Sequence, residues 1–475
     1  MNALELARLQ FGVTTLFHFI FVPVTIGLTA WTAYCQTRWY RSTDEEVWLR
    51  ATRFWGKLML ISLAIGVVTG IVQEFQFGMN WSQYSRYVGD IFGAPLAMEG
   101  LAAFFLESTF VGLWIFGWNR LSPKLHLATI WLTAFGTALS AFFILAANSW
   151  MQHPVGYRLN ATTHHAELTS IWKVLTNSTV LLAFPHTVLG AFTTAGMLVL
   201  GICALGMLRA RGAGSVPGSD VYARSMRAVL PMTLVAAIAT GAFGHAQGTL
   251  MEKQQPMKMA AAEALYETKK GASLSIFAVG PFERHPARLN TDLRIPHLLS
   301  IIGTASWNGE VKGINQINRE EQAKYGPGDY VPIVGVTYWT FRLMSGAGVL
   351  LVLIPLLGLL LLRRGGVERR RWFLRAAVAG IFLPPLANLT GWIFTEMGRQ
   401  PWVVFGLLKT SDARSPLVGS GQILLTLVGY TLIYGTLLVI GGRLFLKDVA
   451  HGPEEPGHDG APPEQAPREE LILAY

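Results

Sequence analysis

The chain has 475 residues, of which 51% are hydrophobic and only 14% are charged, and its formal net charge is +9. Its mean hydropathy is positive, +0.38. This composition excludes an ordinary soluble domain and is typical of a polytopic membrane protein. The positive charge does not indicate a nucleic-acid partner, because the basic residues are concentrated in short loops between apolar runs.

Nine apolar runs are long enough to cross a bilayer, which takes about 20 residues of helix. They predict an all-α membrane protein with about nine transmembrane helices, at 11–34, 58–77, 94–118, 127–148, 180–208, 228–250, 331–362, 373–394 and 417–444. We divide the chain accordingly into a six-helix region, a polar loop, a three-helix region and a tail rich in Pro, Gly and acid that we expect to be disordered: 1–250, 251–330, 331–446 and 447–475.

The distribution of basic residues predicts the orientation of the chain. Lys and Arg are frequent in alternate connections, at 35–57, 119–126, 209–227 and 363–375. The positive-inside rule assigns these connections to the cytoplasm. We therefore expect the N-terminus outside, the C-terminus inside, and the loop 251–330 outside.

The third apolar run contains two glutamates, Glu99 and Glu107. A carboxylate in hydrocarbon is costly, and a chain keeps one there to bind something or to move a proton. Eight residues of helix rise about 12 Å and return to nearly the same face. The pair predicts a proton route or the wall of a buried polar site. The alternative interpretation of Glu107 is a hydrogen-bonded carboxyl that only stabilises helix packing.

Several candidate ligands share one depth. With the predicted orientation, the outer leaflet collects His18, Glu74, Glu99, His186, Met344 and Glu396. Imidazole, thioether and oxygen ligands are groups that haem iron uses. Taken alone, each histidine is more often a packing residue and Met344 is more often part of a core, so the joint depth carries the haem hypothesis. His126 and His245 are interpreted as hydrogen-bonding residues near the interfaces.

Several stretches match one known family: Arg8–Phe11 with His18, Phe54–Lys57, Glu74–Gly78, Gly89–Leu96, Phe104–Phe110, Asn148, Trp150–Gln152 and Gly398–Trp402. On these residues the chain resembles subunit I of the cytochrome bd quinol oxidases, from end to end. The resemblance implies a multi-pass enzyme of the bacterial cytoplasmic (inner) membrane. It would oxidise quinol at an external site and reduce dioxygen to water with cytoplasmic protons, which generates a proton motive force without pumping.

The resemblance also implies three haems: a low-spin haem b, a high-spin haem b and a haem d. His186 and Met344 would be the axial ligands of the low-spin haem, and Arg342 would lie by its propionates or edge. Iron would thus be held by His18, His186, Met344 and Glu396.

The two high-spin sites follow from other matched positions. Glu396 would ligate the high-spin haem b and His18 the haem d, where dioxygen binds. Trp392 and Arg399 would complete the haem-binding set. Members of the family differ in how these two haems are arranged, so which site holds haem d stays open.

The remaining roles implied by the resemblance concern protons and quinol. Glu99 would lie on the distal side of the oxygen-reducing pocket, and the proton route would be lined by Glu107, Ser108 and Ser140. In the loop 251–330, Lys258 and Glu263 match positions linked to quinol binding. The sequence does not distinguish ubiquinol from menaquinol.

The family works as a complex with a second membrane subunit and often with small single-span subunits, in a lipid bilayer. Two features depart from its pattern: the loop 251–330 is short, and His245 stands where an acidic residue is expected. The main competing hypothesis is an ion- or proton-coupled transporter. That class predicts repeat symmetry and broken helices, and neither is evident in the sequence.

Overall fold

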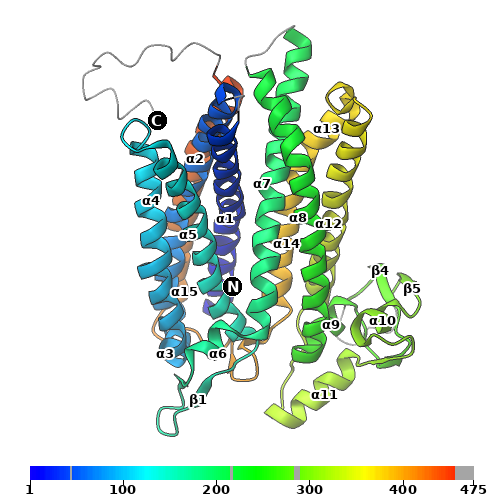
Figure 1. Cartoon of the computed structure of the whole chain (residues 1–475). Helices are drawn as coiled ribbons and strands as arrows, with labels where there is room; N and C mark the ends of the chain where they lie inside the picture. Colours follow the sequence, from blue (N-terminus) through cyan, green and yellow to red (C-terminus); the bar gives the residue numbers. More distant parts are fainter. Residues whose placement is uncertain (43–44, 214–217, 283–288, 455–475) are drawn as a thin grey trace.

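The computed structural model describes residues 1–42, 45–213, 218–282 and 289–454. Within these residues, nine helical segments are long and apolar enough to cross a membrane. They run side by side, and the segment between α8 and α12 folds at one end of the bundle (Figure 1). The predicted α-helical membrane fold is confirmed.

Most spans extend beyond the predicted apolar runs, because polar residues continue the helices beyond hydrocarbon length, although α12 and α15 begin three residues later than predicted and α4 ends two residues earlier. They are α1 (Ala3–Arg41), α2 (Glu45–Met79), α3 (Ser82–Met98) with α4 (Phe105–Phe116), α5 (Pro123–Gln152), α7 (Ser178–Ala213), α8 (Ser219–Gln254), α12 (Val334–Arg363), α13 (Arg371–Ala379) with α14 (Leu383–Met397), and α15 (Ser420–His451).

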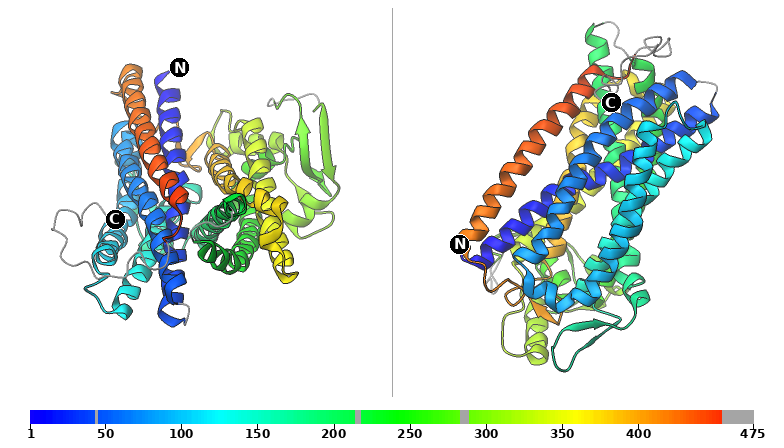
Figure 2. Two further views of the ribbon diagram at one scale, coloured as in Figure 1. Left: turned by 90° about the horizontal axis from the view of Figure 1, so that it is seen from above. Right: turned by 90° about the vertical axis from the view of Figure 1, so that its left-hand side faces the viewer.

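The spans form two groups of four, with α15 on the outside of the first group. The first group contains α1, α2, α3–α4 and α5, and the second contains α7, α8, α12 and α13–α14 (Figure 2). The pair α1 and α7 joins the two groups. A Cβ added to Gly27 of α1 would lie 2.3 Å from the carbonyl oxygen of Ala191 on α7. Glycine therefore allows the two backbones to touch, as small residues do between membrane helices.

Two spans are interrupted. Residues Glu99–Phe104 form a π-helical stretch between α3 and α4, and Gly380–Phe382 form a 3₁₀ turn between α13 and α14. The expectation of uninterrupted helices is wrong at these places. Pro384 and Pro385 at the start of α14 have no N–H to continue the α-helical ladder. A π turn adds a residue to the helix and is frequent at functional sites.

The long loop (residues 251–330) contains α9 (Pro256–Ala262), β3 (Lys269–Lys270), β4 (Leu274–Val279), β5 (Thr291–Ile295), α10 (Leu298–Thr304), β6 (Glu310–Val311) and α11 (Ile314–Tyr325). Antiparallel pairs form between β3 and β6 and between β4 and β5. The stretch from Met257 to Lys270 has a composition typical of a helix, but it is helical only as far as Ala262. The helix stops because Ala264 adopts a left-handed conformation, with φ 46°.

Two further hairpins lie at the same end of the bundle, β1 (Tyr157–Leu159) with β2 (Ala166–Leu168) and β7 (Trp402–Val404) with β8 (Leu408–Lys409). A short helix, α6 (Ile171–Leu175), follows β2. At the other end, α15 continues to His451, past the tail boundary that we placed at 447, because no Gly or Pro lies between Lys447 and Gly452. The rest of the predicted tail, residues 455–475, lies outside the described residues.

Candidate functional site

The rings of His18 and His186 are held in the same way. Nδ1 of His186 lies 2.9 Å from the carbonyl oxygen of Thr240 on α8, so Nδ1 is the protonated donor. Nδ1 of His18 lies 2.9 Å from the hydroxyl of Thr69 on α2, which itself donates to the carbonyl of Ile65. This arrangement leaves Nε2 of both rings with a lone pair, as a metal-ligating histidine requires.

His126 shows the opposite arrangement. Its Nδ1 lies 2.8 Å from the amide nitrogen of Gln36, and its Nε2 lies 2.8 Å from the carbonyl oxygen of Trp114. The indole of Trp114 closes the network by donating to Gln36. Both ring nitrogens are used inside the protein, which confirms the interpretation of His126 as a hydrogen-bonding residue.

Met344 and His186 approach α14 at the same level. A Cβ added to Gly391 of α14 would lie 2.8 Å from Sδ of Met344. On α7, Gly190 lies one turn after His186 and faces Asn388 of α14. On α14, Asn388 lies about one turn before Gly391. Since α7 and α14 run in opposite directions, His186 and Met344 lie at matching heights on either side of α14.

Glu396 lies at the end of α14 in a polar chain that reaches the long loop. Its Oε1 accepts a hydrogen bond of 3.0 Å from Nδ2 of Asn148 on α5. Oδ1 of Asn148 accepts one of 2.9 Å from Gln152, whose Oε1 accepts one of 3.2 Å from Nζ of Lys258. The other carboxylate oxygen of Glu396 pairs with Arg399.

Lys258 is 2% exposed, and its stem packs on Gly398, where an added Cβ would lie 2.7 Å from its Cγ. Burial, reinforced by the positive charge of Arg399, lowers the pKa of Lys258 to about 7. A primary amine with this pKa exchanges protons near neutral pH.

Glu263, the second predicted quinol residue, is 1% exposed and pairs with Arg342 of α12 at 2.8 Å. It also accepts a hydrogen bond of 2.9 Å from the backbone N–H of Ser275. Burial raises the pKa of Glu263, and the charge of Arg342 opposes that rise. Glu263 therefore contacts Arg342, which we predicted to bind haem, whereas Lys258 reaches Glu396 only through Gln152 and Asn148.

The helix α5 covers the two glutamates of the third span. Oγ of Ser140 donates a hydrogen bond of 2.6 Å to Oε1 of Glu99. One turn away, Gly136 lies against Glu107, where an added Cβ would come within 3.0 Å of the backbone nitrogen. The structure thus brings Glu99, Glu107 and Ser140 together. Ser108 is exposed and donates to the carbonyl of Phe105, away from this group.

Several buried polar atoms near these residues have no hydrogen-bond partner within the described part of the chain: Nε1 of Trp392, Nε and Nη1 of Arg399, Nε of Arg342 and Oε2 of Glu99. The indole of Trp392 stacks on Phe19 with ring centroids 5.3 Å apart. The N–H donors of Trp392, Arg399 and Arg342 suit the propionates of a haem. Haem brings its own equatorial ligands and needs only axial ones from the protein, so the residues present fit such a group.

The comparisons with known proteins decide the family. A family model described as cytochrome bd terminal oxidase subunit I matches residues 6–453. The chain belongs to this family. It is therefore a subunit of a cytochrome bd quinol oxidase, a quinol:oxygen oxidoreductase of the respiratory chain, and the family's cofactors are haems.

Individual relatives agree over the whole length. The chain is 43% identical to cytochrome bd ubiquinol oxidase subunit 1 of Bacillus subtilis (strain 168), over 97% of both chains. It is 37% identical to cytochrome bd-II ubiquinol oxidase subunit 1 of Escherichia coli (strain K12), over 95% of this chain and 97% of that one. The solved bd oxidase from Geobacillus thermodenitrificans is similar with a TM-score of 0.85 and 25% identity, over 95% of this chain and 99% of that chain.

Two residues of the polar chain, Asn148 and Gln152, had no role in the sequence analysis, although both belong to motifs that match the family. Their spacing of four on α5 was the available signal, since it places both side chains on one face of a helix. Their partners lie far away in the sequence, so the connection itself was not predictable from spacing.

Proposed function

We propose that this chain binds all three haems of its oxidase, oxidises quinol on the side of the long loop and directs protons from the opposite side to dioxygen. The observation that carries the proposal is the hydrogen-bonded chain from Lys258 through Gln152 and Asn148 to Glu396. It connects a loop residue matched to quinol binding with a carboxylate matched to haem binding.

Four side chains would hold the haems. His186 and Met344 would ligate the low-spin haem b, and Glu396 and His18 would serve the high-spin haem b and the haem d. When bound, these groups supply electron transfer and the binding of dioxygen. The free Nε2 atoms of both histidines and the unpartnered donors of Arg399 and Trp392 support this assignment.

Lys258 and Glu263 would bind the quinol hydroxyls and accept protons as quinol is oxidised to quinone. Both are almost fully buried against the spans, so they keep a fixed position. The lowered pKa of Lys258 suits an amine that accepts a proton and releases it again near neutral pH. Arg342 holds the Glu263 carboxylate in place at 2.8 Å.

Protons for water formation would come from the cytoplasm through Glu107, and then Glu99 with Ser140. Glu107 is 9% exposed and lies two helical turns from Glu99 along the third span. Quinol protons would leave on the outer side while these protons enter from the inner side. This separation of charge would generate a proton motive force without pumping.

The proposed setting is the cytoplasmic membrane of a bacterium, with the N-terminus outside and the C-terminus inside. A second membrane subunit and small single-span subunits would complete the complex. Apolar side chains are exposed along α12 and α15, among them Leu350, Leu425 and Leu432. These faces suit contact with lipid or with those subunits.

The experiment that tests the proposal is a reduced-minus-oxidised spectrum of the purified oxidase, with extraction of its haems as pyridine haemochromes and an assay of quinol-dependent oxygen uptake. We expect haem b and haem d bands together with oxygen uptake. A colourless protein that moves ions across vesicle membranes would instead support the transporter hypothesis.

A further inference from the structure

A stripe of polar side chains on α2 lines the junction at which α2 meets α1 and α15. Its members recur at intervals of three and four residues, which places them on one face: Thr69, Gln73, Gln76 and, directly after the helix, Asn80. The stripe begins at Thr69, whose hydroxyl accepts the hydrogen bond from Nδ1 of His18. It runs from there to the end of the bundle that carries the long loop, which we call the long-loop end (Figure 1).

Hydrogen bonds fix the orientation of the Gln76 amide. The hydroxyl of Thr14 on α1 donates to the carbonyl of Gln10 at 2.8 Å, so its oxygen accepts the hydrogen bond of 2.6 Å from Nε2 of Gln76. Oε1 of Gln76 then has no partner within the described part of the chain, and neither has Nε2 of Gln10. Both side chains are 0% exposed. Oε1 of Gln10 accepts a hydrogen bond of 3.0 Å from Thr426 near the start of α15.

Four buried polar atoms along this junction thus lack a hydrogen-bond partner among the described residues: Nε2 of Gln10, Nε2 of Gln73, Oε1 of Gln76 and Nδ2 of Asn80. A buried polar group without a hydrogen bond is costly, and internal water is the usual partner of such groups. The set contains three donors and one acceptor. Water can bond to both kinds of atom, whereas an ion or an apolar ligand cannot.

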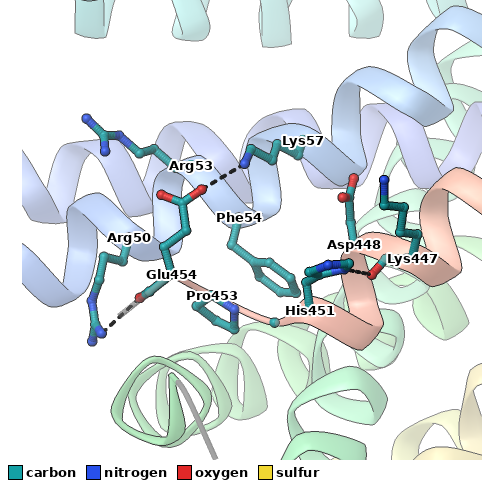
Figure 3. A pocket seen from close by; sticks show the side chains of 10 residues that line it. Arg50, Arg53, Phe54, Lys57, Lys447, Asp448, His451, Pro453 and Glu454 are labelled. Carbon is teal, nitrogen blue, oxygen red and sulfur yellow. Dashed lines mark hydrogen bonds and ion pairs between the residues drawn. The ribbon is translucent and has the colours of Figure 1, made fainter. Parts of the chain in front are cut away.

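The junction is closed toward the opposite end of the bundle. There Gly441 of α15 touches α2, and an added Cβ would overlap with the side chain of Ile65, one turn before Thr69. Farther along, the end of α15 is held to α2 by the ion pair of Lys57 with Glu454 (Figure 3). A row of water that stops at Ile65 cannot carry protons across the whole bundle, so it would not discharge a proton motive force.

We propose that a row of bound water molecules fills this junction from Thr69 to Thr426, and that water exchanges along it between the haem at His18 and the long-loop end. Dioxygen reduction forms water that has to leave, and the row offers it a path. The lining named above consists of amides and hydroxyls that do not titrate, in contrast to the glutamates of the proposed proton route. The exchange with the haem rests on the proposed function, whereas the presence of the water does not.

The first test is a high-resolution cryo-EM map of the purified oxidase. We expect density for ordered water at hydrogen-bonding distance from Oε1 of Gln76 and Nε2 of Gln10. Gln10→Leu/Gln76→Leu should lose this density, because leucine removes both polar atoms and fills their space. Thr29→Val is the matched control, since it removes another buried hydroxyl of α1, one that bonds the carbonyl of Thr25 in its own helix. The control should keep the density.

Hydroxyl-radical labelling with X-ray pulses reports bound water independently, because the radicals form from the water itself. Tyr434 of α15 is only 3% exposed and donates to the carbonyl of Thr69 at 3.2 Å. It should be labelled in the unmodified oxidase and protected in the double leucine variant. Tyr222, also 3% exposed but packed in the apolar core, should stay unlabelled in both.

The exchange with the haem is tested in D₂O by electron–nuclear double resonance, which follows the Nδ1 proton of His18. This proton should exchange more slowly in the double leucine variant than in Thr29→Val, and haem spectra report folding. Equal exchange in the two variants, or an oxidase with all its haems but no water at Gln76, would overturn the proposal. Water at Gln76 in a protein without a haem at His18 would overturn the proposed function and the exchange together, and would leave only the bound water supported.

Discussion

The ammonium of Lys258 and the carboxylate of Glu396 are joined by two amide side chains, Gln152 and Asn148, through hydrogen bonds of 3.2, 2.9 and 3.0 Å. Lys258 belongs to the long loop and Glu396 to the end of α14. We expect a change of charge at one end to alter the hydrogen bonds at the other, since the links between them are partly shielded from solvent. This chain is the most direct connection that the structure offers between the loop and the spans.

Replacing Gln152 by Leu should therefore slow quinol oxidation about tenfold or more, because the buried Lys258 ammonium loses a hydrogen bond. The haem spectra should remain, since Asn148 and Arg399 still hold Glu396. Oxygen uptake is measured on one preparation, with quinol and with an artificial electron donor. The comparison separates a defect in quinol oxidation from a defect at the haems. Gln152→Glu, which keeps an acceptor, should retain more activity; normal turnover in Gln152→Leu would argue against the connection.

Quinol oxidation should depend on pH through Lys258. Its pKa is lowered to about 7, so the neutral amine that accepts a proton is populated above that pH. We expect kcat/KM for quinol to rise as pH increases through about 7, and the rise to be lost in Lys258→Met. Glu263→Gln should also impair quinol oxidation, and both variants should keep all three haem bands. If donors that bypass quinol fail equally in these variants, the quinol-site role is wrong.

His186→Ala and Met344→Leu should each lose the low-spin haem b signal and quinol oxidation, because each removes one proposed axial ligand. Reduced-minus-oxidised spectra report the loss. Met197→Leu is the matched control for Met344→Leu, since Met197 is fully buried in the core of the two helix groups and should keep the haem. Retention of the low-spin haem in both variants would contradict the assignment of His186 and Met344 as its ligands.

Glu107→Gln should keep haem content and assembly but slow oxygen reduction roughly tenfold or more, because the amide keeps the shape and cannot carry a proton. Haem spectra and oxygen uptake are measured on the same preparation. Glu320→Gln, at an exposed position of α11, controls for the loss of a carboxylate. Normal turnover would rule out an essential relay, whereas loss of haem would favour the packing interpretation of Glu107.

Gly27→Ala should destabilise the contact between α1 and α7 by about 1–3 kcal/mol, the usual cost of overpacking. The added Cβ would lie 2.3 Å from the Ala191 carbonyl oxygen and 2.5 Å from the Cβ of Ala195. Gly12→Ala on the same helix is the control, because nothing lies within 4 Å of its added Cβ. The midpoint temperature of thermal inactivation in detergent is measured for both variants. Equal midpoints for Gly27→Ala and Gly12→Ala would contradict the close contact between the backbones of α1 and α7.

Sequence alone determined the class of this protein and the positions of its spans. Hydrophobic length sets a transmembrane helix with little help from tertiary contacts, since the bilayer requires it. The cost of a carboxylate in hydrocarbon likewise singled out Glu99 and Glu107, and the family motifs supplied the candidate ligands and the quinol residues.

Only the tertiary structure decided which of these residues meet. It paired Glu263 with Arg342, connected Lys258 to Glu396, directed Ser140 to Glu99 and left Ser108 exposed. It also distinguished His18 and His186, with Nε2 left for a ligand, from His126, whose two nitrogens are both bonded. Most of these outcomes depend on partners more than 40 residues away in the chain. Helical periodicity reports only which face a residue occupies, not what that face will meet.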